Sequence, residues 1–194
     1  MTWKDIKVAT LQKMFAADGN DIPTDGSADD YLAGMPYVAN EALNMLATAG
    51  RFLIKSYVIE HDGTNAKYNI AALASDYYDI DYILYEKGDI YKEYANYFME
   101  NGKIVLYNAP AGKYTVYYKA YPAEISASTQ DDYTMPLKPE VVVLLPLYMA
   151  SQLYKDDDNA IATTYRNEFE VGFERLNKLI DDSTKEFVSE SGWI

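Results

Sequence analysis

The sequence predicts an α+β protein in which both ends of the chain form a helical bundle and an antiparallel β module is inserted between them. Apolar residues recur every three or four positions near both ends, which is the spacing of one face of a helix. Tyrosine occurs 20 times, and 14 of these tyrosines lie between Tyr57 and Tyr121, a concentration typical of half-buried sheet surfaces. Within that stretch Asn101-Gly102 separates two β-prone runs, and Asn-Gly is the favoured turn of a tight hairpin.

The chain is long enough for one large domain or two small ones. Its 194 residues are 49% hydrophobic, which is sufficient for a packed core and excludes global disorder. The changes of pattern divide it into a discontinuous helical bundle over residues 1–50 and 133–182, a Tyr-rich β module over residues 51–132, and a C-terminal tail over residues 183–194.

Two helices are predicted before the β module. Thr2 and Asp5 resemble a capping box at the start of the first helix, and the turn-forming residues 18–26 end it. The second helix is expected over residues 29–49, where Pro36 either kinks it or marks the first turn of its second half. The apolar positions of the first helix are Ile6, Leu11, Met14 and Phe15.

The middle of the chain predicts strands joined by short turns. Asp62-Gly63 follows the first β-prone run, Asn101-Gly102 joins the next two, and residues 109–112 lead into the last. Such strands form an antiparallel sheet or a sandwich. Residues 67–85 are expected to mix a short strand with irregular, Asp-rich structure. The predicted strands are residues 52–60, 97–99, 104–107 and 113–121.

Two helices are predicted after the β module. Pro139 suits the first turn of a helix over residues 140–154. The first half of that helix is almost wholly apolar, which indicates burial on most sides, and Pro146 is expected to kink it. Asp156, Asp157 and Asp158 break it and place negative charge at the start of the last helix, residues 158–182. The apolar stripe of the last helix is the predicted core of the bundle: Ile161, Tyr165, Phe169, Phe173 and Leu176.

The charge balance argues against a nucleic-acid reader. The net charge is −13 and the pI about 4.4, whereas affinity for nucleic acid comes mainly from Lys and Arg. An acidic wall along which DNA slides without binding stays compatible with this composition.

Nothing in the sequence predicts secretion or membrane insertion. The first residues lack the basic and apolar regions of a signal peptide, and no apolar run approaches the ~20 residues that cross a bilayer. There is no cysteine, so neither disulfides nor thiolate metal sites are available. We therefore expect a soluble protein made in the cytoplasm.

No set of residues predicts catalysis, a cofactor or a metal. His61 is the single histidine and stands beside a turn, where a solvated side chain is expected. The acidic clusters at residues 76–81 and 156–158 lack the order of a calcium-binding loop, so solvated loop charge is the preferred interpretation. The sequence also lacks nucleophile-elbow, phosphate-loop and dinucleotide motifs. We expect a structural protein without enzymatic activity or cofactor.

The tyrosines permit two functional interpretations. Exposed aromatic faces would stack on sugar rings in an acidic, β-rich carbohydrate- or cell-surface-binding module. Tyrosines that fill a sandwich and its contact surfaces would instead indicate a structural module. No polar cluster converges on any of them, which favours the structural interpretation.

Several runs in the second half of the chain together resemble a known family. They match the C-terminal half of head–tail connector (adaptor) proteins of tailed bacteriophages and prophages. The N-terminal half resembles the same proteins more loosely, through residues 39–43 and Leu46. The matching runs are YPAEI (121–125), DYTMPL (132–137), LLPLY (144–148), SQLYKDDD (151–158) and YRNEFE (165–170).

The resemblance implies a subunit of a twelve-fold ring beneath the portal of a phage capsid, joining portal to tail. Its implied partners are the portal protein, a downstream tail or neck protein and further copies of itself, while DNA passes through without specific binding. The implied location is the neck of the virion, after synthesis in the cytoplasm of the bacterial host. Adaptors of short-tailed phages are similar in having a β module inserted in the helical bundle.

The C-terminal tail is the candidate portal-docking segment. It is polar in composition, so it is expected to stay disordered in the free monomer. A Trp-Ile terminus is nevertheless the kind of anchor that fills a partner's pocket, and the resemblance implies docking of this segment into the portal. The candidate docking residues are Phe187, Val188, Trp193 and Ile194.

Overall fold

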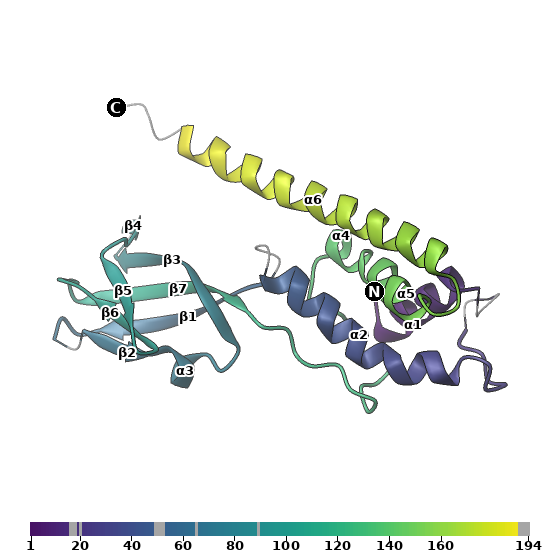
Figure 1. The fold of residues 1–194 in the computed structure, drawn as a ribbon. Helices are drawn as coiled ribbons and strands as arrows, with labels where there is room; N and C mark the ends of the chain where they lie inside the picture. The colour runs from purple at the N-terminus through teal and green to yellow at the C-terminus, as the bar shows by residue number, and fades with distance from the viewer. Residues whose placement is uncertain (16–18, 20, 49–52, 65, 89, 190–194) are drawn as a thin grey trace. The chain divides into compact units, whose positions relative to one another are not determined.

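The chain folds into two compact units. One consists of Met1–Gly50 together with Ala123–Ile194, and the other of Arg51–Pro122. The first is helical and the second is built of strands (Figure 1), so the predicted α+β class is confirmed. The computed structural model describes residues 1–15, 19, 21–48, 53–64, 66–88 and 90–189, and over 179–189 it describes the backbone alone.

The helical unit begins with α1 (Trp3–Lys13) and α2 (Asp29–Thr48). The capping box of α1 is confirmed: Thr2 Oγ1 accepts from the Asp5 N–H at 3.2 Å, and Asp5 Oδ2 accepts from the Thr2 N–H at 2.8 Å. These two bonds satisfy backbone donors that the first turn of a helix leaves free. Helix α2 continues through Pro36 as one element.

The apolar segment after the β module forms two helices instead of one kinked helix. They are α4 (Pro139–Val142) and α5 (Leu145–Leu153). Pro146 lies in the first turn of α5, where its missing N–H costs nothing, whereas inside a continuous helix it would remove a hydrogen bond and clash with the preceding turn. Helix α5 packs against α1, α2 and α6.

The last helix, α6, spans Asn159–Ser189 and has 31 residues. It starts where the sequence predicts, because Asp158 Oδ1 caps it by accepting the N–H groups of Ala160 and Ile161, both at 3.0 Å. It extends seven residues beyond residue 182, the predicted end, into the segment expected to be a tail. At ~1.5 Å per residue its length is about 46 Å.

Residues 123–132 belong to the helical unit, although the sequence-based division places them in the β module. The backbone N–H groups of Trp3 and Lys4 donate to the carbonyls of Tyr133 and Asp131 at 2.8 and 2.9 Å. This segment therefore uses the free donors at the start of α1.

The β unit contains two antiparallel sheets and one short helix. The four-stranded sheet has the order β1-β7-β3-β4, and the three-stranded sheet has the order β2-β6-β5. The elements are β1 (Ile54–His61), β2 (Lys67–Asn69), α3 (Ile70–Leu73), β3 (Tyr77–Lys87), β4 (Ile90–Glu93), β5 (Tyr97–Glu100), β6 (Lys103–Leu106) and β7 (Gly112–Ala120).

The predicted hairpin is confirmed, and one predicted irregular segment is wrong. Asn101 and Gly102 join β5 to β6 with φ values of 49° and 72°, the two positive angles that a type I′ turn requires. Residues 67–85 contain most of the eleven-residue strand β3 in addition to β2 and α3. Two register shifts interrupt the pairing of β3 with β7, and such bulges disturb the alternation by which a strand is recognised.

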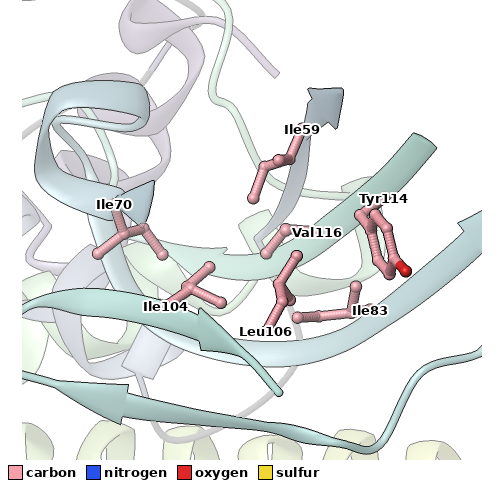
Figure 2. Packing of buried hydrophobic residues seen from close by; sticks show 7 residues of the cluster. All are labelled: Ile59, Ile70, Ile83, Ile104, Leu106, Tyr114 and Val116. Carbon is pink, nitrogen blue, oxygen red and sulfur yellow. The ribbon is translucent and has the colours of Figure 1, made fainter. Parts of the chain in front are cut away.

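The core of the β unit lies between its two sheets. Its residues come from both sheets and from α3, and their side chains point toward one another (Figure 2). The β unit is therefore a sandwich, one of the two predicted alternatives. The central cluster consists of Ile59, Ile70, Ile83, Ile104, Leu106, Tyr114 and Val116.

Candidate interaction surfaces

The predicted core stripe on α6 is unevenly buried. Phe169 is 1% exposed and meets the ring of Tyr148 on α5 edge-on, with centroids 5.1 Å apart. Ile161, Tyr165, Phe173 and Leu176 are only partly buried. The ring of Phe173 stacks on Phe169 at 6.0 Å, so the stripe is packed most tightly around Phe169.

Arg166 holds α6 to α5. Its guanidinium lies 5.0 Å from the centroid of the Tyr148 ring, a cation–π contact. Its Nε donates to Glu170 Oε1 at 2.7 Å. Arg166 is therefore used within the helical unit.

A shallow groove runs along α6. Val171 in this groove is 50% exposed, and Glu168 and Arg175 are exposed as well. The groove is lined by Thr164, Asn167, Glu168, Val171, Gly172 and Arg175.

The net charge of the chain is concentrated in the helical unit. Its two segments contain 21 acidic and nine basic residues, a net charge of −12, while Arg51–Pro122 contains nine acidic and eight basic residues, a net charge of −1. The two units therefore suit different partners. The strongly negative helical unit repels polyanions, whereas the nearly neutral β unit has little electrostatic repulsion toward another nearly neutral protein surface.

The acidic first turn of α2 meets the acidic loop over residues 156–158. Tyr31, at the start of α2, donates from its hydroxyl to Asp157 Oδ2 at 2.7 Å, and this bond raises the pKa of Tyr31 to about 12. The exposed carboxylates of Asp29 and Asp30 thus share one end of the unit with the loop 156–158. Within the part of the chain that the structure describes, no group of three acidic or histidine side chains is arranged to hold a metal ion.

Most tyrosines of the β unit pack within it. Tyr114 is fully buried and donates to the Pro110 carbonyl at 2.8 Å. Tyr82 and Tyr117 stack with their ring centroids 4.5 Å apart. Of the 14 tyrosines between residues 57 and 121, the more exposed ones are Tyr78, Tyr91, Tyr107 and Tyr121.

The expectation for His61 is wrong. Its side chain is 5% exposed, with Nδ1 2.7 Å from the Tyr68 hydroxyl and Nε2 3.1 Å from the Ala109 carbonyl. The sequence does contain a signal for this burial, because Tyr57, Ile59 and His61 alternate along β1 and point to one face. His61 therefore ties β1 to β2 of the other sheet and to the loop before β7.

The family of the chain follows from comparison with known proteins. The model of the SU10 adaptor protein family matches residues 1–188. The chain belongs to the SU10 adaptor protein family. The match covers both units, and it confirms the resemblance to phage adaptors inferred from the sequence.

The family also gives the general role of this adaptor. As a phage adaptor it is a virion protein that associates with other phage neck or tail proteins. No curated protein matches the chain. Among the described residues, no helix of this adaptor combines the length and the apolar character that crossing a membrane requires.

The candidate docking residues are the last apolar residues of the sequence. Phe187 and Val188 belong to the described backbone of α6, which ends at Ser189. Trp193 and Ile194 lie outside the described residues. The helical extension over residues 183–189 adds about 10 Å of helix beyond residue 182, at ~1.5 Å per residue.

Proposed function

We propose that this adaptor forms a ring in the phage neck, joins the portal to the tail and lines the DNA channel. It acts as a structural protein, without enzymatic activity or cofactor. Helix α5 packs against α1 and α2 from the start of the chain and against α6 from its end, which supports a helical bundle built by both chain ends. The family match supports the adaptor role, and the twelve-fold symmetry is carried over from the resemblance.

The observation that carries the channel proposal is the net charge of −12 on the helical unit. Duplex DNA has one negative charge per about 1.7 Å of its axis. A wall of the same sign does not neutralise phosphates, so it gives DNA no strong electrostatic site at which to stop. We therefore assign the channel wall to the helical unit.

The contact with the portal is assigned to the end of α6 and the residues that follow it in the sequence. Helix α6 has 31 residues and continues to Ser189, so Phe187 and Val188 lie in its last turn. Apolar anchors at its end suit a pocket on a partner, where a buried aromatic side chain contributes most of the binding free energy. The proposed anchors are Phe187, Val188, Trp193 and Ile194.

Binding to immobilised portal protein tests this proposal. Full-length adaptor should be retained, and the double variant Trp193→Ala, Ile194→Ala should be lost with an unchanged melting temperature. Phe15→Ala is the control, because Phe15 is 71% exposed at the other end of the sequence and its removal should leave retention unchanged. Retention of the double variant at the wild-type level would contradict the proposal that the terminus docks into the portal.

The same preparation tests the rival function. If full-length adaptor does not bind portal protein but a monomer binds glycans, the carbohydrate- or cell-surface-binding module replaces the adaptor proposal. Binding to portal protein without glycan binding supports the adaptor.

A further inference from the structure

The four-stranded sheet ends in two open edges. Its order is β1-β7-β3-β4, so β1 and β4 lie at opposite sides of the same sheet (Figure 1). Within the described residues, neither strand has a second partner in the sheet. An open edge presents backbone N–H and C=O groups that another strand can pair with.

The hydrogen-bond pattern shows which residues offer these groups. In β1, the bond from Ala120 N to Leu53 O sets the alternation, so every second residue, including Ser56 and Val58, directs its backbone groups away from β7. Next to β4, the bond from Tyr94 N to Ile83 O sets the same alternation. Tyr91 lies three residues before Tyr94, so it directs its backbone groups away from β3.

Neither edge strand is blocked by proline or by a bulge, although β1 carries Lys55 and the four-residue β4 carries Lys92. Strand β1 pairs with β7 over eight residues without a register shift, and neither β1 nor β4 contains proline, whereas proline and bulges are common devices that block an edge. Apolar side chains are exposed on both: Val58 is 45% exposed on β1, and Ile90 and Tyr91 are 55% and 64% exposed on β4.

The directions of the strands fit a second copy of this chain. All pairs in the sheet are antiparallel, so β1 and β4, three steps apart, run in opposite directions. A second copy in the same orientation, as in a ring, therefore brings its β1 antiparallel to β4. This contact joins two different surfaces, which is the head-to-tail geometry that closes into a ring.

The charges also favour a second copy at this place. The β unit has a net charge of −1, against −12 for the helical unit, so copies of the chain repel each other least where their β units meet.

We infer that β4 of one copy pairs with β1 of the next, so that the four-stranded sheets form the contact between neighbouring copies in the ring. In the register that we assign, Tyr91 stands opposite Val58 of the next copy, and Ile90 opposite Ile59. This register places the exposed side chains of Val58 and Tyr91 against each other. The inference rests on the proposed ring and names the surface that builds it.

Engineered cysteines test the pairing without background, because the chain has no cysteine. Opposite residues of an antiparallel pair lie about 5.5 Å apart between Cα atoms, within the reach of a disulfide. After assembly on portal protein and oxidation, the double variant Val58→Cys, Tyr91→Cys should give a ladder of covalent oligomers. The control pair, Tyr37→Cys with Val58→Cys, replaces Tyr91 by Tyr37 of the helical unit, which is 77% exposed against 64% for Tyr91, and it should give no ladder.

Three other results overturn the inference, and one of them also overturns the ring. Rings on the portal without a Val58–Tyr91 ladder show that the copies meet through another surface. Covalent dimers from Val58→Cys alone show two-fold pairing of β1 with itself. If wild-type protein forms no rings on the portal, the proposed function is contradicted as well. This outcome differs from rings without a ladder, which contradict only the pairing of β4 with β1.

A proline at the edge gives an independent readout. In Val58→Pro the lost N–H points away from β7, so the monomer should keep its melting temperature, as proline is tolerated at such edge positions. Ring assembly on the portal should be lost. Assembly at the wild-type level with a folded Val58→Pro variant contradicts the pairing.

Discussion

The side-chain amide of Asn40 holds both backbone polar groups of Ile125. Its Nδ2 donates to the Ile125 carbonyl at 2.8 Å, and its Oδ1 accepts from the Ile125 N–H at 2.7 Å. Ile125 is 2% exposed, so water cannot easily replace these bonds. One side chain of α2 thus fixes the segment in which the chain returns to the helical unit.

Replacing Asn40 should therefore cost more stability than its size suggests. Asn40→Ala leaves a buried donor and a buried acceptor without partners, which we expect to lower the free energy of unfolding by about 2–4 kcal/mol. Asn44→Ala is the matched control, since Asn44 is exposed on the same helix. Urea titrations that find the two variants equally stable would contradict this role of Asn40.

Phe169 should be the most sensitive position on α6. Its truncation in Phe169→Ala removes the contacts with Tyr148 and Phe173 and leaves a cavity, at an expected cost of about 3–5 kcal/mol. Val171→Ala, at a half-exposed position two residues away, should cost less than about 0.5 kcal/mol. Thermal melting that shows Phe169→Ala within a degree or two of wild type would mean that this part of α6 does not pack on α5.

Loss of the hydroxyl should change the free energy of unfolding in opposite directions at Tyr57 and Tyr114. The Tyr57 hydroxyl is buried and has no hydrogen-bond partner among the described residues, so Tyr57→Phe should stabilise the protein by about 1 kcal/mol. The Tyr114 hydroxyl donates to Pro110, so Tyr114→Phe should destabilise it by a similar amount. Denaturant unfolding measures both; destabilisation by Tyr57→Phe would reveal a partner for its hydroxyl.

Acid should weaken the β unit through Asp76. Burial raises the pKa of Asp76, but hydrogen bonds from Lys55 and Tyr118 outweigh it, so the pKa lies below its ordinary value. A lowered folded-state pKa gives stability that is present above the unfolded pKa, about 3.9, and is lost as the pH falls through the folded pKa. The advantage of wild type over Asp76→Asn in unfolding free energy should therefore shrink below about pH 4.

Tyr118→Phe serves as the intermediate case for that experiment. It removes one of the two donors to Asp76, so its pH dependence should fall between those of wild type and Asp76→Asn. An advantage of wild type that stays constant from neutral to acid pH would show that Asp76 is not stabilised as an anion.

The features that the sequence predicts well depend on residues close together in the chain. The Thr2–Asp5 capping box needs four residues, and the turn at Asn101-Gly102 needs two, so their chemistry is complete within a short segment. Asp158 caps α6 in the same way. These elements can be located without knowing how the rest of the chain packs.

The features that the sequence misses depend on distant partners. The burial of His61 requires Tyr68 and Ala109 from other parts of the β unit. The pairing candidates Val58 and Tyr91 become recognisable only when the strand order places β1 and β4 at the two edges. The separation of charge between the units likewise needs the division at Arg51–Pro122, because acidic residues occur throughout the sequence.

Cryo-electron microscopy of the adaptor assembled on its portal protein tests the central claim most directly. The account predicts a ring coaxial with the portal, with the acidic helical unit, Met1–Gly50 and Ala123–Ile194, facing the channel. A ring whose channel is lined by the near-neutral β unit, or adaptor bound as separate monomers on the outside of the portal, would contradict it.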